Sequence, residues 1–138
     1  MTSKELWFAS HVKEISREEC LELLASRPVG RIAYCDEAGP VALPVNYILD
    51  GQHVLFRISP HSEMAKHLRN GPASFQVDEI DEYTQSGWSV LLRGHAEFIE
   101  YDELPDEGSR PEPWAEGHRT FHVRLIPSRI TGRRLIEA

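Results

Sequence analysis

The run VGRIAYCDEAGPVALPVNYILDGQHVLFRIS, residues 29–59, decides the fold class. Its segments 29–36, 40–49 and 53–59 have the period-two pattern and the β-branched and aromatic content that are typical of strands. An Asp-Glu-Ala-Gly turn separates the first two segments, and the pair Asp50-Gly51 separates the second and third. Because tight hairpin turns need positive φ, an Asp-Gly pair favours one. The run therefore predicts consecutive antiparallel strands.

Three more strand-like runs follow, at residues 73–81, 87–101 and 119–126. The middle run is long enough to bend at Gly94, because a glycine inside a strand favours a bulge or the close approach of another backbone. The last run is expected to end before Pro127, since proline cannot donate a hydrogen bond to a sheet.

Two helices are predicted by their capping residues. Ser16 and Glu19 form a capping box, which predicts a helix that begins near Ser16 and ends before Pro28. Ser62 is a good N-cap for a short helix over about residues 63–69. About six strands in meander order, with one leading and one inserted helix, predict a mainly β fold, a small antiparallel barrel or half-open barrel.

Length and charge narrow the classes of protein. The chain has 138 residues, which we interpret as a single domain over 1–138, and a formal net charge of -7. A net negative chain is a poor nucleic-acid binder, because affinity for phosphates comes from clustered Lys and Arg. No apolar run approaches the roughly 20 residues of a membrane span, and the amino terminus lacks the apolar core of a signal peptide. We therefore expect no nucleic-acid or membrane partner and a cytoplasmic location.

Cysteine and histidine spacing argues against a metal or disulfide framework. Cys20 and Cys35 are not paired as CxxC, and both are expected to be small apolar residues of the core. His118 and His122 stand four apart, but they flank the start of a predicted strand, where this spacing separates their side chains. We expect no metal site.

The predicted hairpin around Asp50-Gly51 separates two faces. If the strands pair symmetrically about these two residues, one face is apolar and is expected to join the core: Leu43, Val45, Tyr47, Val54, Phe56 and Ile58. The other face has small or polar residues around a single arginine: Ala42, Pro44, Asn46, Leu55, Arg57 and Ser59.

Arg57 and Ser62 predict an anion-binding cradle where the third strand meets the short helix. Backbone amides at the helix start and the Ser62 hydroxyl can donate to an anion, and the Arg57 guanidinium suits phosphate. Lys66, one turn into the helix, can add a second positive charge. The alternative is that Arg57 is an ordinary surface residue and Ser62 only a cap, and Glu63 favours it because a carboxylate can itself satisfy the helix end.

The carboxy-terminal part of the chain is rich in arginine and follows an acidic segment that begins at Glu97. Pairing between the two segments, or a subunit contact, is the simplest interpretation. The arginines concerned are Arg119, Arg124, Arg129, Arg133 and Arg134.

The order of these blocks resembles the pyridoxamine 5′-phosphate oxidase-like flavoproteins with the FMN-binding split barrel. The resemblance rests on a leading helix followed by the run 29–81, GWSVLLRGHAEFI (87–99) and RLIPSRITGRRL (124–135), and it covers roughly residues 15–136. It implies an FMN-dependent oxidoreductase that transfers hydride to or from a small organic substrate. It also implies a homodimer with the cofactor at the subunit interface.

The resemblance also assigns residues to the cofactor. It implies that Pro44, Val45 and Asn46 run along the isoalloxazine edge and that Arg57, Ser59 and Ser62 hold the phosphate. Trp88 and Ser89 are expected to approach the same flavin from the partner subunit. Where many members carry a lysine shortly after the phosphate-binding serine, this chain has Glu63 and Met64, so either Lys66 supplies the charge instead or phosphate binding is weaker.

Two alternatives stay open at this point. The same fold can use a deazaflavin coenzyme, whose long phosphorylated tail needs an open basic groove that Arg31, Arg93 and the carboxy-terminal arginines could provide. The second alternative is a non-catalytic module that stores or senses flavin or haem. Nothing in the sequence identifies a catalytic acid, the substrate or the electron donor.

Overall fold

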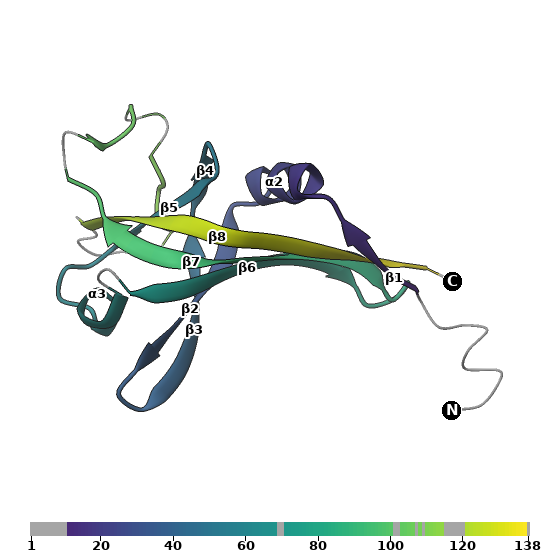
Figure 1. The fold of residues 1–138 in the computed structure, drawn as a ribbon, viewed down its shortest axis with the longest axis horizontal. Coiled ribbons are helices and arrows are strands. Elements are labelled where there is room, and N and C mark those ends of the chain that lie inside the picture. Colours follow the sequence, from purple (N-terminus) through teal and green to yellow (C-terminus); the bar gives the residue numbers. More distant parts are fainter. Residues whose placement is uncertain are drawn as a thin grey trace.

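The computed structural model describes residues 11–68, 71–100, 103–106, 108, 110–114 and 121–137. In these ranges the chain forms one curled antiparallel sheet and two short helices, α2 (Arg17–Ala25) and α3 (Glu63–Leu68) (Figure 1). This architecture confirms the predicted mainly β, half-open barrel. The strands are β1 (His11–Ile15), β2 (Val29–Asp36), β3 (Gly39–Asn46), β4 (Ile48–Asp50), β5 (His53–Ile58), β6 (Pro72–Asp81), β7 (Ser86–Phe98) and β8 (Phe121–Ile136).

The strand order is β3-β2-β6-β7-β8-β5-β4, and β1 pairs with β8. The prediction of a simple meander was therefore wrong: β6, β7 and β8 follow one another in the sheet, while β2 pairs with β6 and β5 pairs with β8. The structure also has more strands than the six predicted. The sequence pattern did not show β1, and the run 40–49 divides into β3 and β4 at Tyr47.

Helix α2 begins as its capping box predicts. The backbone N–H of Glu19 donates to Ser16 Oγ at 3.1 Å, and Cys20 and Leu24 on the inner face of the helix are fully buried. The Tyr47 hydroxyl donates to the carbonyl of Leu24, which joins the helix end to the sheet. Burial raises the pKa of Tyr47 well above the usual tyrosine value, so the phenol stays a neutral donor. In the described ranges no helix is long and apolar enough to cross a membrane.

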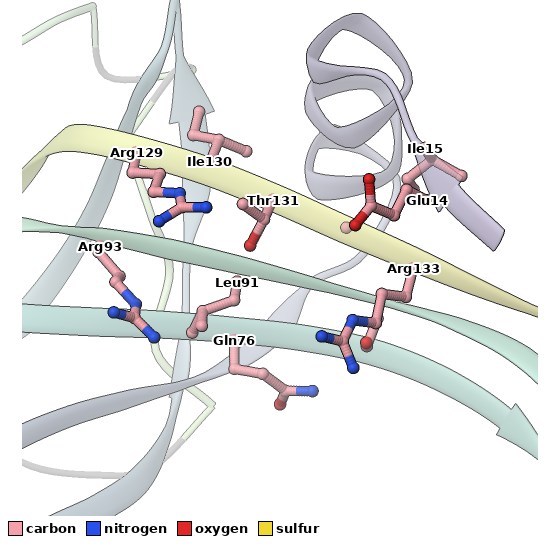
Figure 2. A pocket seen from close by; sticks show the side chains of 11 residues that line it. Glu14, Ile15, Gln76, Leu91, Arg93, Arg129, Ile130, Thr131 and Arg133 are labelled. Atoms are coloured by element: carbon pink, nitrogen blue, oxygen red, sulfur yellow. The ribbon is translucent and has the colours of Figure 1, made fainter. Parts of the chain in front are cut away.

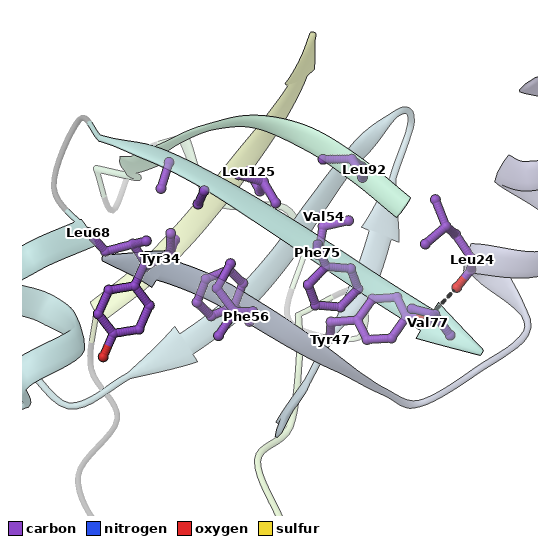
Figure 3. Packing of buried hydrophobic residues seen from close by; sticks show 14 of the residues in the cluster. Leu24, Tyr34, Tyr47, Val54, Phe56, Leu68, Phe75, Val77, Leu92 and Leu125 are labelled. Atoms are coloured by element: carbon purple, nitrogen blue, oxygen red, sulfur yellow. Dashed lines mark hydrogen bonds between the residues drawn. The ribbon is translucent and has the colours of Figure 1, made fainter. Parts of the chain in front are cut away.

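The core fills the concave side of the curled sheet (Figure 3). Phe75 is completely buried and packs edge-on against Tyr47, with 4.7 Å between the ring centroids. The predicted core residues Tyr47, Val54, Phe56 and Ile58 are buried. Cys20 is also buried as predicted, but Cys35 is exposed, because alternate residues of β2 face outward.

The prediction of the two hairpin faces was partly wrong. The turn consists of Gly51 and Gln52, not Asp50 and Gly51, since Asp50 pairs with His53 and only Gly51 has positive φ, at 62°. Leu43 lies on the edge strand β3 and is 41% exposed. Leu55 is only 1% exposed, because β5 lies between β4 and β8.

The seam between β7 and β8 contains the predicted bend. Arg93 pairs with Arg129 but Gly94 pairs with Pro127, so Ser128 is an extra residue in β8. A Cβ atom at Gly94 would lie 1.9 Å from the Ile126 carbonyl oxygen, which explains why glycine is needed there. The prediction that the last strand ends before Pro127 was wrong, because the bulge accommodates the proline and β8 continues to Ile136.

Candidate functional site

A pocket of about 470 Å³ opens between β3, the end of β5 and the start of α3. We call it the cradle pocket. Six of the residues that the sequence assigned to a cofactor line it together: Pro44, Val45, Asn46, Arg57, Ser59 and Ser62. The remaining lining residues are Tyr34, Leu43, Ile58, Glu63, Met64 and Pro113. The fold therefore brings β3 and the β5–α3 junction to one place, although the two strands do not pair with each other.

Local hydrogen bonds fix the loop between β5 and α3. The Ser62 hydroxyl donates to the Ser59 carbonyl at 2.8 Å and accepts from the backbone N–H of Ala65 at 3.1 Å, which makes it the N-cap of α3. The Ser59 hydroxyl accepts from the backbone N–H of His61 at 3.3 Å. Both hydroxyls therefore stabilise the loop, so this end of the pocket is preorganised before a ligand binds.

Asn46 connects the pocket rim to two other segments. Its Nδ2 donates to the Pro28 carbonyl at 3.4 Å, and its Oδ1 accepts from the backbone N–H of Trp114 at 2.8 Å. This second bond brings the proline-rich segment 110–114 to the rim, where Pro113 lines the pocket. Trp114 is 74% exposed. Sequence analysis could not find this contact, because 68 residues separate its two partners.

Charges of both signs face the pocket. Arg57, on β5, is the basic lining residue, and Glu63 is the acidic one. Glu63 lies 3.4 Å from His67 one turn later in α3. Tyr34 was expected only as a core residue, and it is 6% exposed. Burial, then the nearby carboxylates of Asp36 and Glu63, raise the pKa of Tyr34, so its hydroxyl stays protonated at neutral pH.

Three of the predicted site residues lie outside the cradle pocket. Lys66 lies 3.8 Å from Glu37 and lines a neighbouring hollow beside His61. Trp88 is 8% exposed within the core, and Ser89 lines a third hollow over β7 and β8 (Figure 2). Because the resemblance places Trp88 and Ser89 across a subunit interface, their contact with a cofactor stays a prediction.

The third hollow, which we call the arginine hollow, has a volume of about 590 Å³. Its basic residues are Arg93 on β7 and Arg129 and Arg133 on β8, and Arg93 stands directly opposite Arg129 in the ladder. These three form no ion pair with any residue that the structure describes, whereas Arg124 of the same basic segment lies 2.9 Å from Glu97, as the sequence led us to expect. The face that carries them is the one that the resemblance assigns to the subunit interface.

The candidate metal ligands do not form a cluster in the described part of the chain. No three His, Cys, Asp or Glu side chains gather there in a way that could hold a metal ion. His118 lies outside the described residues. His122 lies on β8 directly opposite Arg57, so its backbone borders the cradle region.

The fold and the cradle pocket define a class of protein, a split β-barrel with a partly basic pocket at the β5–α3 junction. A comparison with protein families matches residues 16–134 to the family described as pyridoxamine 5′-phosphate oxidase. The chain belongs to this family.

Individual relatives are similar over most of the chain. An uncharacterized protein of Mycobacterium tuberculosis is 27% identical over 93% of this chain and 88% of its own length. The structure of an FAD-binding protein from Mycobacterium smegmatis has a TM-score of 0.70 and 29% identity, covering 90% of this chain and 98% of that one. A heme-binding protein from the same organism has a TM-score of 0.67 and 25% identity, covering 84% of this chain and 54% of that one.

Proposed function

We propose that the protein is a flavin-dependent oxidoreductase that binds FMN in the cradle pocket and transfers hydride to or from a small organic substrate. The observation that carries the proposal is that Asn46, Arg57, Ser59 and Ser62 line one pocket, although they come from two strands and a loop. These are the residues that the family resemblance assigns to the cofactor. The FAD-binding relative of Mycobacterium smegmatis supports a flavin, and FAD shares with FMN the ring and the first phosphate.

The chemistry of the lining fits such a ligand. At one end, the Arg57 guanidinium and the hydroxyls of Ser59 and Ser62 can bind phosphate oxygens. The apolar side chains of Leu43, Val45 and Met64 provide a surface for a planar ring, with the Asn46 amide beside them. A bound flavin supplies the hydride transfer, and the protein supplies position and electrostatics.

Two groups in the cradle pocket, Ser62 and Glu63, limit the strength of phosphate binding. The Ser62 hydroxyl already donates to the Ser59 carbonyl, so it must turn from that oxygen to donate to a phosphate. The Glu63 carboxylate repels a phosphate, and its side chain is 77% exposed, so water screens part of this repulsion. Arg57 therefore supplies the main attraction within the pocket.

The proposal includes a homodimer in which Ser89 of each chain reaches the cofactor of the other, while Trp88, whose side chain packs in the core of its own chain, takes part through its backbone. Both residues lie on β7, away from the cradle pocket of their own chain. An exposed sheet face that carries Ser89 is compatible with this arrangement.

The test begins with the chromophore that co-purifies with the full chain. Absorbance separates a flavin, with two bands, from a deazaflavin, with one, and from haem, and mass spectrometry of the released compound separates FMN from FAD. Arg57→Ala should weaken FMN binding by about 10- to 100-fold, because a charge-assisted phosphate contact is lost. Arg57→Lys should have a smaller effect, and Arg17→Ala, on exposed α2, should leave FMN affinity unchanged.

Unchanged flavin occupancy in a folded Arg57→Ala protein would contradict the cradle. The heme-binding relative favours a second function, a module that binds flavin or haem without catalysis. A haem spectrum in the purified protein, or bound flavin that neither NADH nor NADPH reduces, would support that function instead.

A further inference from the structure

The segment 110–114, part of the connection between β7 and β8, is held beside the cradle pocket by its own contacts and not by sheet pairing. The Arg110 Nε donates to the Pro105 carbonyl at 2.8 Å, and Pro111 is buried. Pro111 and Pro113 fix their own φ and hold the residues before them in an extended conformation. The two prolines and these contacts therefore make the segment stiff.

The last residues of this segment lie at one end of the cradle pocket. Pro113 lines the pocket, and the backbone N–H of Trp114 donates to Asn46 Oδ1 at 2.8 Å. In the proposed function Asn46 lies beside the isoalloxazine ring, whereas Arg57 binds the phosphate at the other end. Trp114 therefore stands beside the expected place of the reactive ring, which we call the ring end of the pocket.

Trp114 is unusual because its backbone is fixed by a hydrogen bond while the residue is 74% exposed. Trp88, by contrast, is 8% exposed and packs in the core. Exposure of so large an apolar side chain forgoes the free energy that burial would give, and an indole stacks well on other flat rings. Leu43, which lines the pocket from β3, is also exposed, at 41%. The rim at the ring end therefore offers apolar surface to a ligand.

The charges of the cradle pocket lie at its other end. Among the described lining residues, the charged ones are Arg57 and Glu63, at the β5–α3 junction. The ring end is lined by Val45 and Pro113, with the Asn46 amide beside them. Because an unpaired charge is costly in apolar surroundings, this end of the pocket favours an uncharged ligand.

We propose that Trp114 is a specificity-determining residue that selects a flat, conjugated and uncharged substrate at the ring end of the pocket. This inference rests on the proposed function, since the flavin supplies the ring beside which the substrate binds. The Trp114 indole stacks on the substrate and holds it in place, whereas a saturated ring of the same size presents no π-face and gains less from the contact. Trp114 itself transfers no proton or electron.

The test is an isothermal titration of the full chain loaded with FMN. The probes are 2-naphthol, which is flat and conjugated, and decahydro-2-naphthol, which has the same skeleton but is saturated. Wild type should bind 2-naphthol more tightly. Trp114→Ala should weaken 2-naphthol binding by about 10-fold and remove this preference, while Trp114→Phe, which keeps a flat ring, should lose less. Tyr83→Ala removes a 96% exposed aromatic residue from the turn between β6 and β7, and as the matched control it should change neither affinity.

FMN titration separates this inference from the proposed function. Trp114→Ala should bind FMN as tightly as wild type, because Trp114 contacts the substrate and not the cofactor. Equal 2-naphthol affinity in wild type and Trp114→Ala, with FMN bound to both, would overturn the inference and leave the proposed function standing. A loss of FMN affinity in Trp114→Ala would overturn it as well, since Trp114 would then belong to the cofactor site. Absence of FMN binding in wild type would contradict the proposed function itself, and this inference with it.

Discussion

The cradle pocket and the arginine hollow are both lined by arginine, but they differ in how their polar groups are used. In the cradle pocket, Ser59, Ser62 and Asn46 already hold the surrounding backbone through hydrogen bonds. In the hollow, two facing arginines have no ion-pair partner in the described ranges, and only their strands position them. The difference teaches that the cradle is preorganised by its own loop, whereas the arginines of the hollow depend on the sheet alone for their position.

The largest expected effect concerns the sheet beneath the hollow. Gly94→Ala places a Cβ atom 1.9 Å from the Ile126 carbonyl oxygen, so the β7–β8 seam must shift. We expect a loss of about 3 kcal/mol or more in the free energy of unfolding. The control lies in the β4–β5 turn: at Gly51 a Cβ meets no atom within 4 Å, and its φ of 62° limits the cost of Gly51→Ala to about 1 kcal/mol.

Urea denaturation of the two variants measures this contrast. If Gly94→Ala were no more damaging than Gly51→Ala, the bulged seam would be able to relax, and the fixed placement of Arg93 against Arg129 would lose its basis.

The next effect compares two arginines of the same strand. Arg124→Gln removes a half-buried ion pair to Glu97 and should lower the free energy of unfolding by about 1–2 kcal/mol. Arg129→Gln removes a like-charge contact with Arg93, so it should leave stability unchanged or raise it by up to about 0.5 kcal/mol. Thermal unfolding at low and high salt measures the stability of both variants. An equal loss of stability in the two would show that Arg129 has a stabilising partner.

The smallest effect concerns the acidic residue of the cradle. Glu63→Lys should tighten FMN binding by a few-fold, because it replaces a repelling charge with an attracting one at an exposed position. Glu37→Lys is the control, since Glu37 lies beside Lys66 and does not line the cradle pocket. Flavin fluorescence titration gives both affinities. A weaker affinity in Glu63→Lys would show that this side chain points away from the phosphate.

Local sequence signals predicted much of the fold. The Ser16 capping box, the Ser62 cap and the bend at Gly94 were found because each depends on a few neighbouring residues. The sheet order could not be predicted in the same way, since the pairing of β2 with β6 depends on the whole chain. Pro127 misled the prediction of the last strand, because a proline at a bulge interrupts no ladder hydrogen bond.

The cradle pocket was also predictable in part. The predicted alternation placed Asn46, Arg57 and Ser59 on one face, and all three line the pocket. This part of the prediction is correct even though the hairpin turn lies one residue further along the chain than predicted. Helical spacing alone does not show that the Lys66 side chain reaches Glu37, so its contact with a phosphate stays a prediction. The sequence indicated Arg93 and the carboxy-terminal arginines as candidates for a basic groove, but it could not show which of them meet, because their placement depends on the register of two strands more than 30 residues apart in the chain.

The central claim is that the β5–α3 junction binds the phosphate end of a flavin. A crystal structure of the full chain grown with FMN tests it most directly. We expect the phosphate to contact the Arg57 guanidinium and the serine hydroxyls of the cradle, with the ring along Pro44, Val45 and Asn46. FMN bound in the arginine hollow instead, with the Glu63 carboxylate turned onto Arg57, would contradict the claim.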